Sequence, residues 1–215
     1  MNIIIFSIWG TALTFYLIFT FWHKNWRGPL RESEIADFMA RIEANENLNE
    51  KQRQMMLEFM HNDKGNEFFM VNFLAFPKGK VAHPKSGVMM SPPALLQDYF
   101  KPFIGRLLGT AGYPAFTAQI KGDYIEAWGV EANPNWQAVG LIRYRSRRDM
   151  FLAATDAAFG DIHVYKRAAL AVTFAVPVES NGGLLISPRI WLAFLLAACA
   201  ALGHVAYLTF TTMSG

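Results

Sequence analysis

The chain has 215 residues, a formal charge of +3 and a single cysteine, Cys199. The charge is mild, and the basic residues are scattered or lie beside apolar segments, which argues against nucleic acid as a partner. One cysteine excludes an intrachain disulfide and a thiolate metal cluster built by one copy. We also expect no other metal and no cofactor, because the sequence carries no motif for binding one.

Two apolar segments lie near the ends of the chain. Residues 1–22 and 190–211 are each long enough to cross a bilayer, which takes ~20 apolar residues as a helix. Lys24, Arg27 and Arg31 follow the first segment, Arg189 precedes the second, and neither tail carries Lys or Arg. This pattern predicts a protein of the bacterial inner membrane with two spans, a cytoplasmic globular domain and both termini outside.

The first segment is expected to remain as an anchor, because no basic residue precedes its apolar core and no small-residue cleavage site follows it. Aromatic and basic residues at the span ends are expected at the membrane interface, where the basic ones also attract anionic lipids. These residues are Trp22, Lys24, Trp26, Arg27, Arg189 and Trp191.

Each span carries small residues at helical spacing. They are Ser7, Gly10, Thr11 and Thr14 in the first span, and Ala193, Ala197 and Ala201 in the second. Such stripes let membrane helices approach closely, so they could dock on each other, on a second copy or on another membrane protein. They could equally reflect the usual composition of such helices. His204 is the ionisable group deep in the second span, and its role stays open between a functional group and a neutral, hydrogen-bonded side chain.

Residues 23–65 form a juxtamembrane linker and amphipathic helices. A helix over 33–44 is expected with Ser33 as its cap. Asn47 with Glu50 resembles a capping box at the start of a second helix, whose apolar face is rich in methionine. That face could bind a partner helix or the membrane, although packing on its own domain is the commoner outcome.

Residues 66–180 alternate between strand and helix patterns. Strands are expected over 68–76, 115–127, 136–145 and 168–178, and helices over 95–108 and from Ser146 to about 159. A Gly/Pro/Ser-rich loop is expected over 78–93, and a linker over 181–189 with Gly182–Gly183. The order strand, helix, strand, strand, helix, strand predicts an α+β, ferredoxin-like βαββαβ domain with two helices on one sheet face.

Within this domain, five stretches resemble the dimeric α/β-barrel superfamily, especially its uncharacterised bacterial single-domain members. They are FFMVNFLAF, LLQDYFKPF, the Ala111–Gly112 pair, WQAVGLIRYRSRRDM and DIHVYKRAALAVTFAVP. The resemblance implies a homodimer in which two sheets pair to form a closed barrel. The superfamily includes monooxygenases, isomerases, lyases and members without known activity, so it leaves the function open.

The residues contain no nucleophile elbow, phosphate loop, dinucleotide fingerprint or metal-binding motif. His163 is the best candidate acid or base, with Arg167 as a neighbouring donor to an anionic ligand. The alternative is a solvated helix end. Asn72, Tyr99 and Arg143 are further polar candidates for a cleft between sheet and helices, and Arg143 could instead pair across a dimer.

The two anchors and the lack of a catalytic motif favour an accessory or assembly subunit of an inner-membrane protein complex, with another integral membrane protein as partner. The alternative is a membrane-tethered, monooxygenase- or isomerase-like enzyme that acts on a lipophilic small molecule. A ligand sensor that signals to the spans is a third hypothesis.

Overall fold

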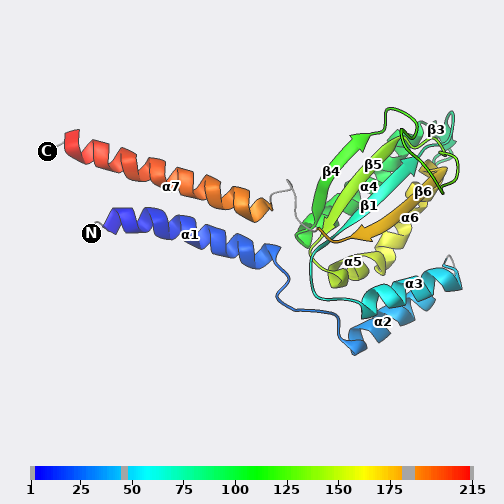
Figure 1. Ribbon diagram of the computed structural model, residues 1–215, viewed down its shortest axis with the longest axis horizontal. Helices are drawn as coiled ribbons and strands as arrows, with labels where there is room; N and C mark the ends of the chain where they lie inside the picture. Colours follow the sequence, from blue (N-terminus) through cyan, green and yellow to red (C-terminus); the bar gives the residue numbers. More distant parts are fainter. Residues whose placement is uncertain (1–2, 45–47, 181–186, 214–215) are drawn as a thin grey trace. The chain divides into compact units, whose positions relative to one another are not determined.

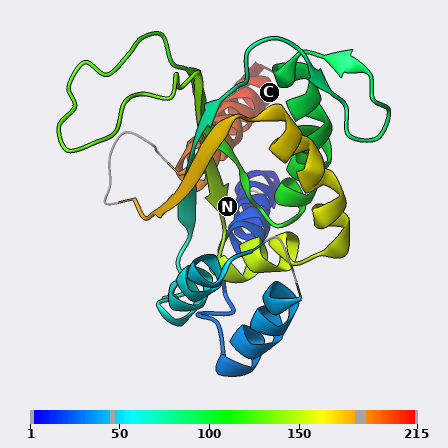
Figure 2. The same ribbon diagram turned by 90° about the vertical axis from the view of Figure 1, so that its right-hand side faces the viewer.

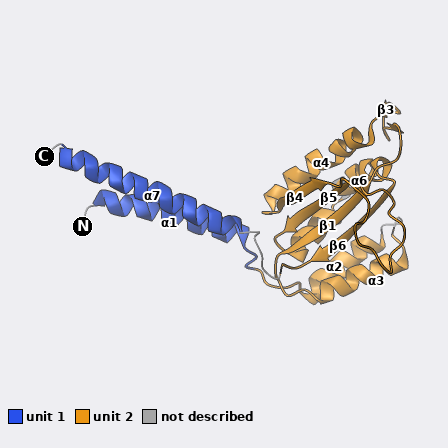
Figure 3. Ribbon diagram, turned by 45° about the horizontal axis from the view of Figure 1, so that its top comes forward, with its two compact units in different colours: residues 1–26, 181–215 blue, residues 27–180 orange. Residues whose placement is uncertain are grey.

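The computed structural model describes residues 3–44, 48–180 and 187–213 and divides into two units. One unit consists of residues 1–26 with 181–215, and the other of residues 27–180 (Figure 3). The first unit holds helix α1 (Ile3–His23) and helix α7 (Pro188–Met213), which run antiparallel and pack together (Figure 1). Both helices are long and apolar enough to cross a membrane. Gly182–Gly183 and Asn47 lie outside the described residues.

The second unit is a mixed α+β domain. After α2 (Glu32–Glu43) and α3 (Glu50–His61) come the elements that build the sheet layer and its cover. In chain order these are β1 (Phe68–Ala75), β2 (Val81–Ala82), β3 (Met89–Met90), α4 (Pro92–Gly109), β4 (Tyr113–Gln119), β5 (Ala138–Tyr144), α5 (Arg147–Ala154), α6 (Ala157–Ala169) and β6 (Val172–Val178).

Four strands form an antiparallel sheet in the order β4-β5-β1-β6. In the register, Phe68 lies opposite Tyr144 and Leu74 lies opposite Ala138. Because side chains alternate along a strand, Leu74, Ile142 and Tyr144 point to one face of the sheet. This is the face that α4 and α6 cover, and their apolar sides join it in the main core. Figure 2 shows the two helices on one side of the sheet.

A second apolar cluster joins α2 and α3 to α5. Ile35, Phe38 and Met60 pack there against Phe151. The methionine-rich side of α3 therefore packs largely on its own domain, although Met55 remains exposed. At the start of α3 the capping box lies two residues later than Asn47 and Glu50 suggested. Asn49 Oδ1 accepts from the Gln52 amide at 2.9 Å, and Gln52 Oε1 accepts from the Asn49 amide.

The predicted helix boundaries need three corrections. Helix α2 begins after Arg31, not Ser33, because the carboxylate of Glu34 reaches back to accept from the Arg31 amide. The helix capped by Ser146 ends at Ala154, where Thr155 bonds back to the Phe151 carbonyl, and α6 begins as a separate helix. Helix α6 then continues through Ala169, so the last strand begins only at Val172.

Two predicted segments also differ in their structure. The strand expected over 115–127 ends at Gln119, because the Lys121–Gly122–Asp123 sequence starts a turn in which Asp123 accepts from the next amide. The loop expected over 78–93 contains the short hairpin of β2 and β3 and the first turn of α4. Val81 and Met90 of that hairpin pack against the main core.

Candidate functional site

The sheet face away from α4 and α6 is apolar across all four strands, and we call it the open face. Its side chains follow from the register: Phe69 lies opposite Val178, and Phe73 lies opposite both Phe174 and Val139. The most exposed of them include Phe116 on β4 and Phe174 on β6, at 49% and 43%. The described members are Phe69, Val71, Phe73, Tyr113, Phe116, Ala118, Val139, Leu141, Val172, Phe174, Val176 and Val178. An exposed apolar surface of this extent is typical of an interaction site.

The helix-covered face holds the polar residues of the domain interior. Asn72 and Tyr144 point to this face by strand alternation, and Tyr99 enters it from α4. On α6, the centre of the His163 ring lies 6.1 Å from that of the Tyr99 ring. Lys166 Nζ lies over the same Tyr99 ring, 5.6 Å from its centre. The fold therefore brings together three sequence-predicted candidates, Asn72, Tyr99 and His163, on one side of the sheet.

Burial governs the charge states of this cluster. Desolvation, followed by the nearby charges of Lys166 and Arg167, lowers the pKa of His163 to about 4, so the imidazole is neutral at physiological pH. Desolvation also lowers the pKa of Lys166 and raises the pKa of the Tyr99 and Tyr144 phenols. A neutral imidazole beside the protonated phenol of Tyr99 can exchange hydrogen bonds with a ligand, but it is a poor acid.

The remaining two polar candidates have other surroundings. Arg143 is 1% exposed and its guanidinium donates to the Glu67 carboxylate and to the Ala111 carbonyl. On the strand it alternates with Tyr144, so it lies on the other side of the sheet from the His163 cluster. It is a structural residue at the end of the sheet, not a cleft donor. Arg167 is exposed on α6.

A cluster of buried arginines, not predicted from the sequence, lies at the junction of β5 and α5. Arg148, with a side chain 3% exposed, donates to both oxygens of Glu34 and to the carbonyls of Gly28 and Pro29. Arg147 donates to the Phe59 carbonyl. The available signal was the run RYRSRRD, since four arginines cannot be buried on a strand and helix start without carboxylate partners.

These contacts tie the segment after α1 to the domain. The Arg148 guanidinium lowers the pKa of Glu34 to about 2, mainly through their hydrogen bonds. Arg147 also lies 3.7 Å from Asp63 and 3.3 Å from Glu179. The cluster therefore fastens the linker, α2 and the end of α3 to α5, and its role is architectural.

His83 lies between β2 and β3, where its ring has several polar neighbours. Its Nδ1 accepts from the Lys85 and Ser86 amides at 3.2 and 3.0 Å, and it lies 3.0 Å from the Ser86 hydroxyl. Its Nε2 lies 3.7 Å from Asp98. The order Asp98, His83, Ser86 has the outline of a catalytic triad, but two backbone donors already occupy the nitrogen that would act as base. We interpret it as a turn stabilised by histidine. Among the described residues, no group of three or more His, Cys, Asp or Glu is placed to hold a metal.

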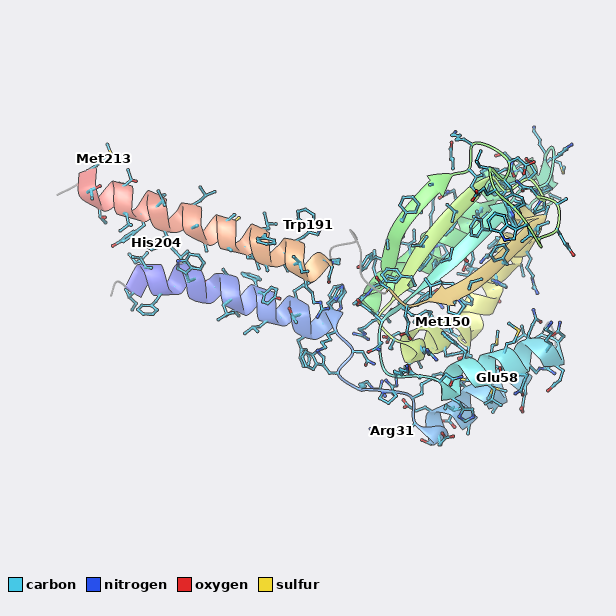
Figure 4. All side chains as sticks on the ribbon, in the orientation of Figure 1. Arg31, Glu58, Met150, Trp191, His204 and Met213 are labelled. Atoms are coloured by element: carbon cyan, nitrogen blue, oxygen red, sulfur yellow. The ribbon has the colours of Figure 1, made fainter. Side chains whose placement is uncertain are left out.

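In the unit of residues 1–26 and 181–215, α1 and α7 meet through apolar and small residues. A Cβ at Gly203 would lie 3.7 Å from the Ile8 side chain, so the helices approach closely there. His204 lies on the side of α7 toward α1, and its Nδ1 accepts from the Trp9 indole at 3.4 Å (Figure 4). Its observed partner is thus a side-chain donor of the neighbouring helix.

The polar stripe of α1 is turned away from this contact. Ser7, Gly10, Thr11 and Thr14 are all exposed and line a shallow hollow with Phe15. The Ser7 and Thr14 hydroxyls donate to carbonyls one turn back. On α7, Ala197 and Ala201 are exposed, Ala193 is half-buried and Ala200 is buried. The two predicted stripes therefore do not dock on each other.

The predicted interface residues lie at the end of the pair where α1 finishes and α7 begins. Trp22 is in the last turn of α1, and Trp191 is in the first turn of α7 (Figure 4). The Trp26 indole donates to the Phe21 carbonyl, and Lys24 lies over its ring. Arg189 bonds to Ser187, and Arg27 lies 3.2 Å from Glu34.

Comparisons with known proteins identify a similar fold but no family. No protein-family model and no curated protein matches the chain. A crystal structure of a protein of unknown function from Rhodopseudomonas palustris matches with a TM-score of 0.50 at 14% identity, over 60% of this chain and 94% of that one. The methylated form of that protein matches with a TM-score of 0.49 at 14% identity, over 61% and 93%.

Proposed function

We propose that this chain is a membrane-anchored accessory or assembly subunit of an inner-membrane protein complex, with a homodimeric, ferredoxin-like domain in the cytoplasm. The observation that carries the proposal is a surface on each unit that the unit itself leaves exposed. In the domain this surface is the apolar open face, and in the membrane unit it is the small and polar Ser7–Thr14 side of α1. An exposed apolar face of this extent is typical of an interaction site, and a stripe of small and polar residues is typical of a packed membrane helix.

The order β4-β5-β1-β6 and the chain order of strands and helices support the ferredoxin-like assignment. Under that assignment the open face receives a second copy, as the resemblance to dimeric α/β barrels implies. The basic residues beside the spans support the cytoplasmic orientation, because cytoplasmic flanks carry an excess of Lys and Arg.

The membrane partner is proposed to dock on the polar stripe of α1. Gly10 has no atom within 4 Å of where its Cβ would lie, so a larger side chain there leaves the α1–α7 contact intact. Small residues such as Gly10 allow a partner helix to approach closely, where packing and interhelical hydrogen bonds stabilise the complex. The partner is therefore an integral membrane protein with its own closely packing helix.

The experiment is mild-detergent purification of tagged full-length protein from its native membrane, with mass spectrometry of what accompanies it. We expect a stoichiometric integral membrane protein, which is lost from Gly10→Leu but retained by Leu13→Phe. Leu13 is the matched control because it is also exposed but lies off the stripe. Purification of the wild-type protein alone in every mild detergent would refute the assignment.

A second function is favoured by the cluster of buried Tyr99 with half-buried His163 and Lys166. Three polar side chains beside an apolar core could bind a lipophilic, hydrogen-bonding molecule that reaches the domain from the bilayer. The chain would then be a membrane-tethered enzyme or a ligand sensor. A small apolar compound that co-purifies with the wild type but not with His163→Leu would favour this function over the first.

A further inference from the structure

The 18-residue connection between β4 and β5 is an ordered arm with an apolar tip. This arm, residues 120–137, is closed at its base by the Ile120 amide, which donates to the Gln137 carbonyl at 3.0 Å. Farther out, Asp123 Oδ1 accepts from Asn133 Nδ2 at 2.8 Å. The Trp136 indole donates to the Tyr124 hydroxyl at 3.1 Å. These bonds give the arm a defined shape.

The tip exposes apolar side chains that its own domain does not cover. Ile125 is 98% exposed, Trp128 79% and Val130 64%. A large aromatic and two β-branched residues together at the end of an ordered loop are costly to leave in water, since each gains roughly 1.5–3 kcal/mol when it is buried. The tip is therefore built to contact something outside the chain's own fold.

The arm continues the open face of the sheet. The Trp136 ring at its base lies 5.8 Å from the Phe73 ring and 5.2 Å from the Phe174 ring, both on the open face. In Figure 2 the arm stands out from the sheet on the side away from α4 and α6. A body that docks on the open face would thus lie beside the arm.

The arm adds to the area that the open face can bury against a partner. Strands about 4.8 Å apart and seven residues long give a four-stranded sheet a flat area of roughly 450 Å². A stable interface buries about 800 Å² on each partner. Protruding side chains make the accessible area of a face larger than its flat area, and an aromatic arm beside the sheet supplies further buried area.

Charge argues against the lipid surface as the occupant. The arm carries Asp123, Glu126 and Glu131 against a single Lys121, so it is acidic. Anionic headgroups of an inner leaflet would repel it. A protein surface is the remaining kind of partner. The open face beside the arm is apolar, so two copies of it can pack on each other.

We infer that the arm clasps a second copy of this chain: when two open faces meet, the Ile125–Val130 tip of each protomer packs on the other. This inference rests on the homodimer in the proposed function and names an element that the dimer requires. Trp128 is its central anchor, because large aromatic side chains dominate the binding energy of interfaces.

Contact is tested by photo-crosslinking from the tip. Ile125→Cys is introduced with Cys199→Ala, labelled with benzophenone maleimide and reconstituted as full-length protein into vesicles that contain only this protein and lipid. We expect a product of twice the chain mass, with the crosslink mapped to a second copy. A lipid adduct, or no product, overturns the inference. The control is Val88→Cys, since the Val88 side chain is also exposed, at 62%, but lies on the β2–β3 hairpin away from the arm.

Affinity is tested by energy transfer between labelled full-length copies as the vesicles are diluted with lipid. Trp128→Ser should weaken dimerisation about thirtyfold, as a dominant interface residue does, whereas Val88→Ser should not change it. Phe174→Lys on the open face should abolish the dimer. If Phe174→Lys does so and Trp128→Ser has no effect, the arm inference fails and the dimer stands. A monomeric wild type refutes both, while the co-purification experiment still tests the accessory role separately.

Discussion

Replacing Arg148 by methionine removes the guanidinium that fastens the segment after α1 to α5. Arg148 donates to Glu34 at 2.7 and 2.9 Å and to the Gly28 and Pro29 carbonyls at 3.1 and 2.7 Å. Methionine keeps most of the volume but none of the donors. Hydrogen bonds to charged groups contribute roughly 1.5–3 kcal/mol each to stability, net of the hydrogen bonds to water that they replace. Since Glu34 and the linker can be rehydrated when they open, we expect a net loss of about 3 kcal/mol.

The loss should concentrate on α2 and the linker, because the main core does not involve Arg148. Hydrogen exchange of full-length protein in detergent measures this locally. A loss of about 3 kcal/mol lowers the protection of amides in residues 32–43 by about a hundredfold. The control is Arg27→Gln, which removes a second cation from the same carboxylate. The Arg27 side chain is 68% exposed, so its contribution should stay under about 0.5 kcal/mol.

The same pair predicts a pH dependence with a definite sign. The pKa of Glu34 falls from 4.5 to about 2 in the folded state. A depressed carboxyl pKa stabilises the fold fully above pH 4.5, and this stabilisation is lost as the pH falls from 4.5 toward 2. Wild-type α2 should lose protection across this window, and Glu34→Gln should lack that component. Equal protection in Arg148→Met, Arg27→Gln and wild type would refute the role given to Arg148.

Three further outcomes are expected. The His163 pKa of about 4 means that acidification from pH 6.5 toward 4 destabilises the domain, and His163→Leu should remove this component from pH-dependent unfolding. Gly112→Ala should lower the free energy of unfolding by about 1–3 kcal/mol, because its Cβ would lie 2.9 Å from the Arg143 carbonyl oxygen. The control is Gly105→Ala, in open space on α4, which should be neutral or stabilising in the same denaturant unfolding assay. Gly203→Leu should separate α1 from α7 and lower the yield of folded protein in detergent, while Gly10→Leu should not. An unchanged result for either disruptive glycine variant would contradict the packing described.

Local patterns sufficed for some features because their causes lie within a few residues. The two apolar helices follow from composition alone, as their length and hydropathy require no tertiary contact. The Ser146 cap was predictable because its hydroxyl accepts from the Asp149 amide three residues later. The strand core of β1 and β5 was visible as apolar runs, and the α+β class followed from their order.

The predicted boundaries of helices and strands were wrong where a contact outside the local pattern determines them. Helix α2 begins after Arg31 because Glu34 bonds back to its amide, and Arg148, distant in the sequence, orders the same carboxylate. The end of β4 depends on the arm that follows it. An apolar residue such as Ile125 favoured a strand prediction, although it lies at an exposed tip.

Composition and periodicity alone thus determined that two membrane-length helices flank an α+β domain in the sequence. They sufficed because the spacing of apolar residues within each element indicates its type and its buried face. Only the tertiary structure decided which side chains meet. It placed Asn72, Tyr99 and His163 on one face of the sheet and paired Arg143 with Glu67 on the other. The reason is that register and helix packing join residues far apart in the chain, and no local pattern records those partners.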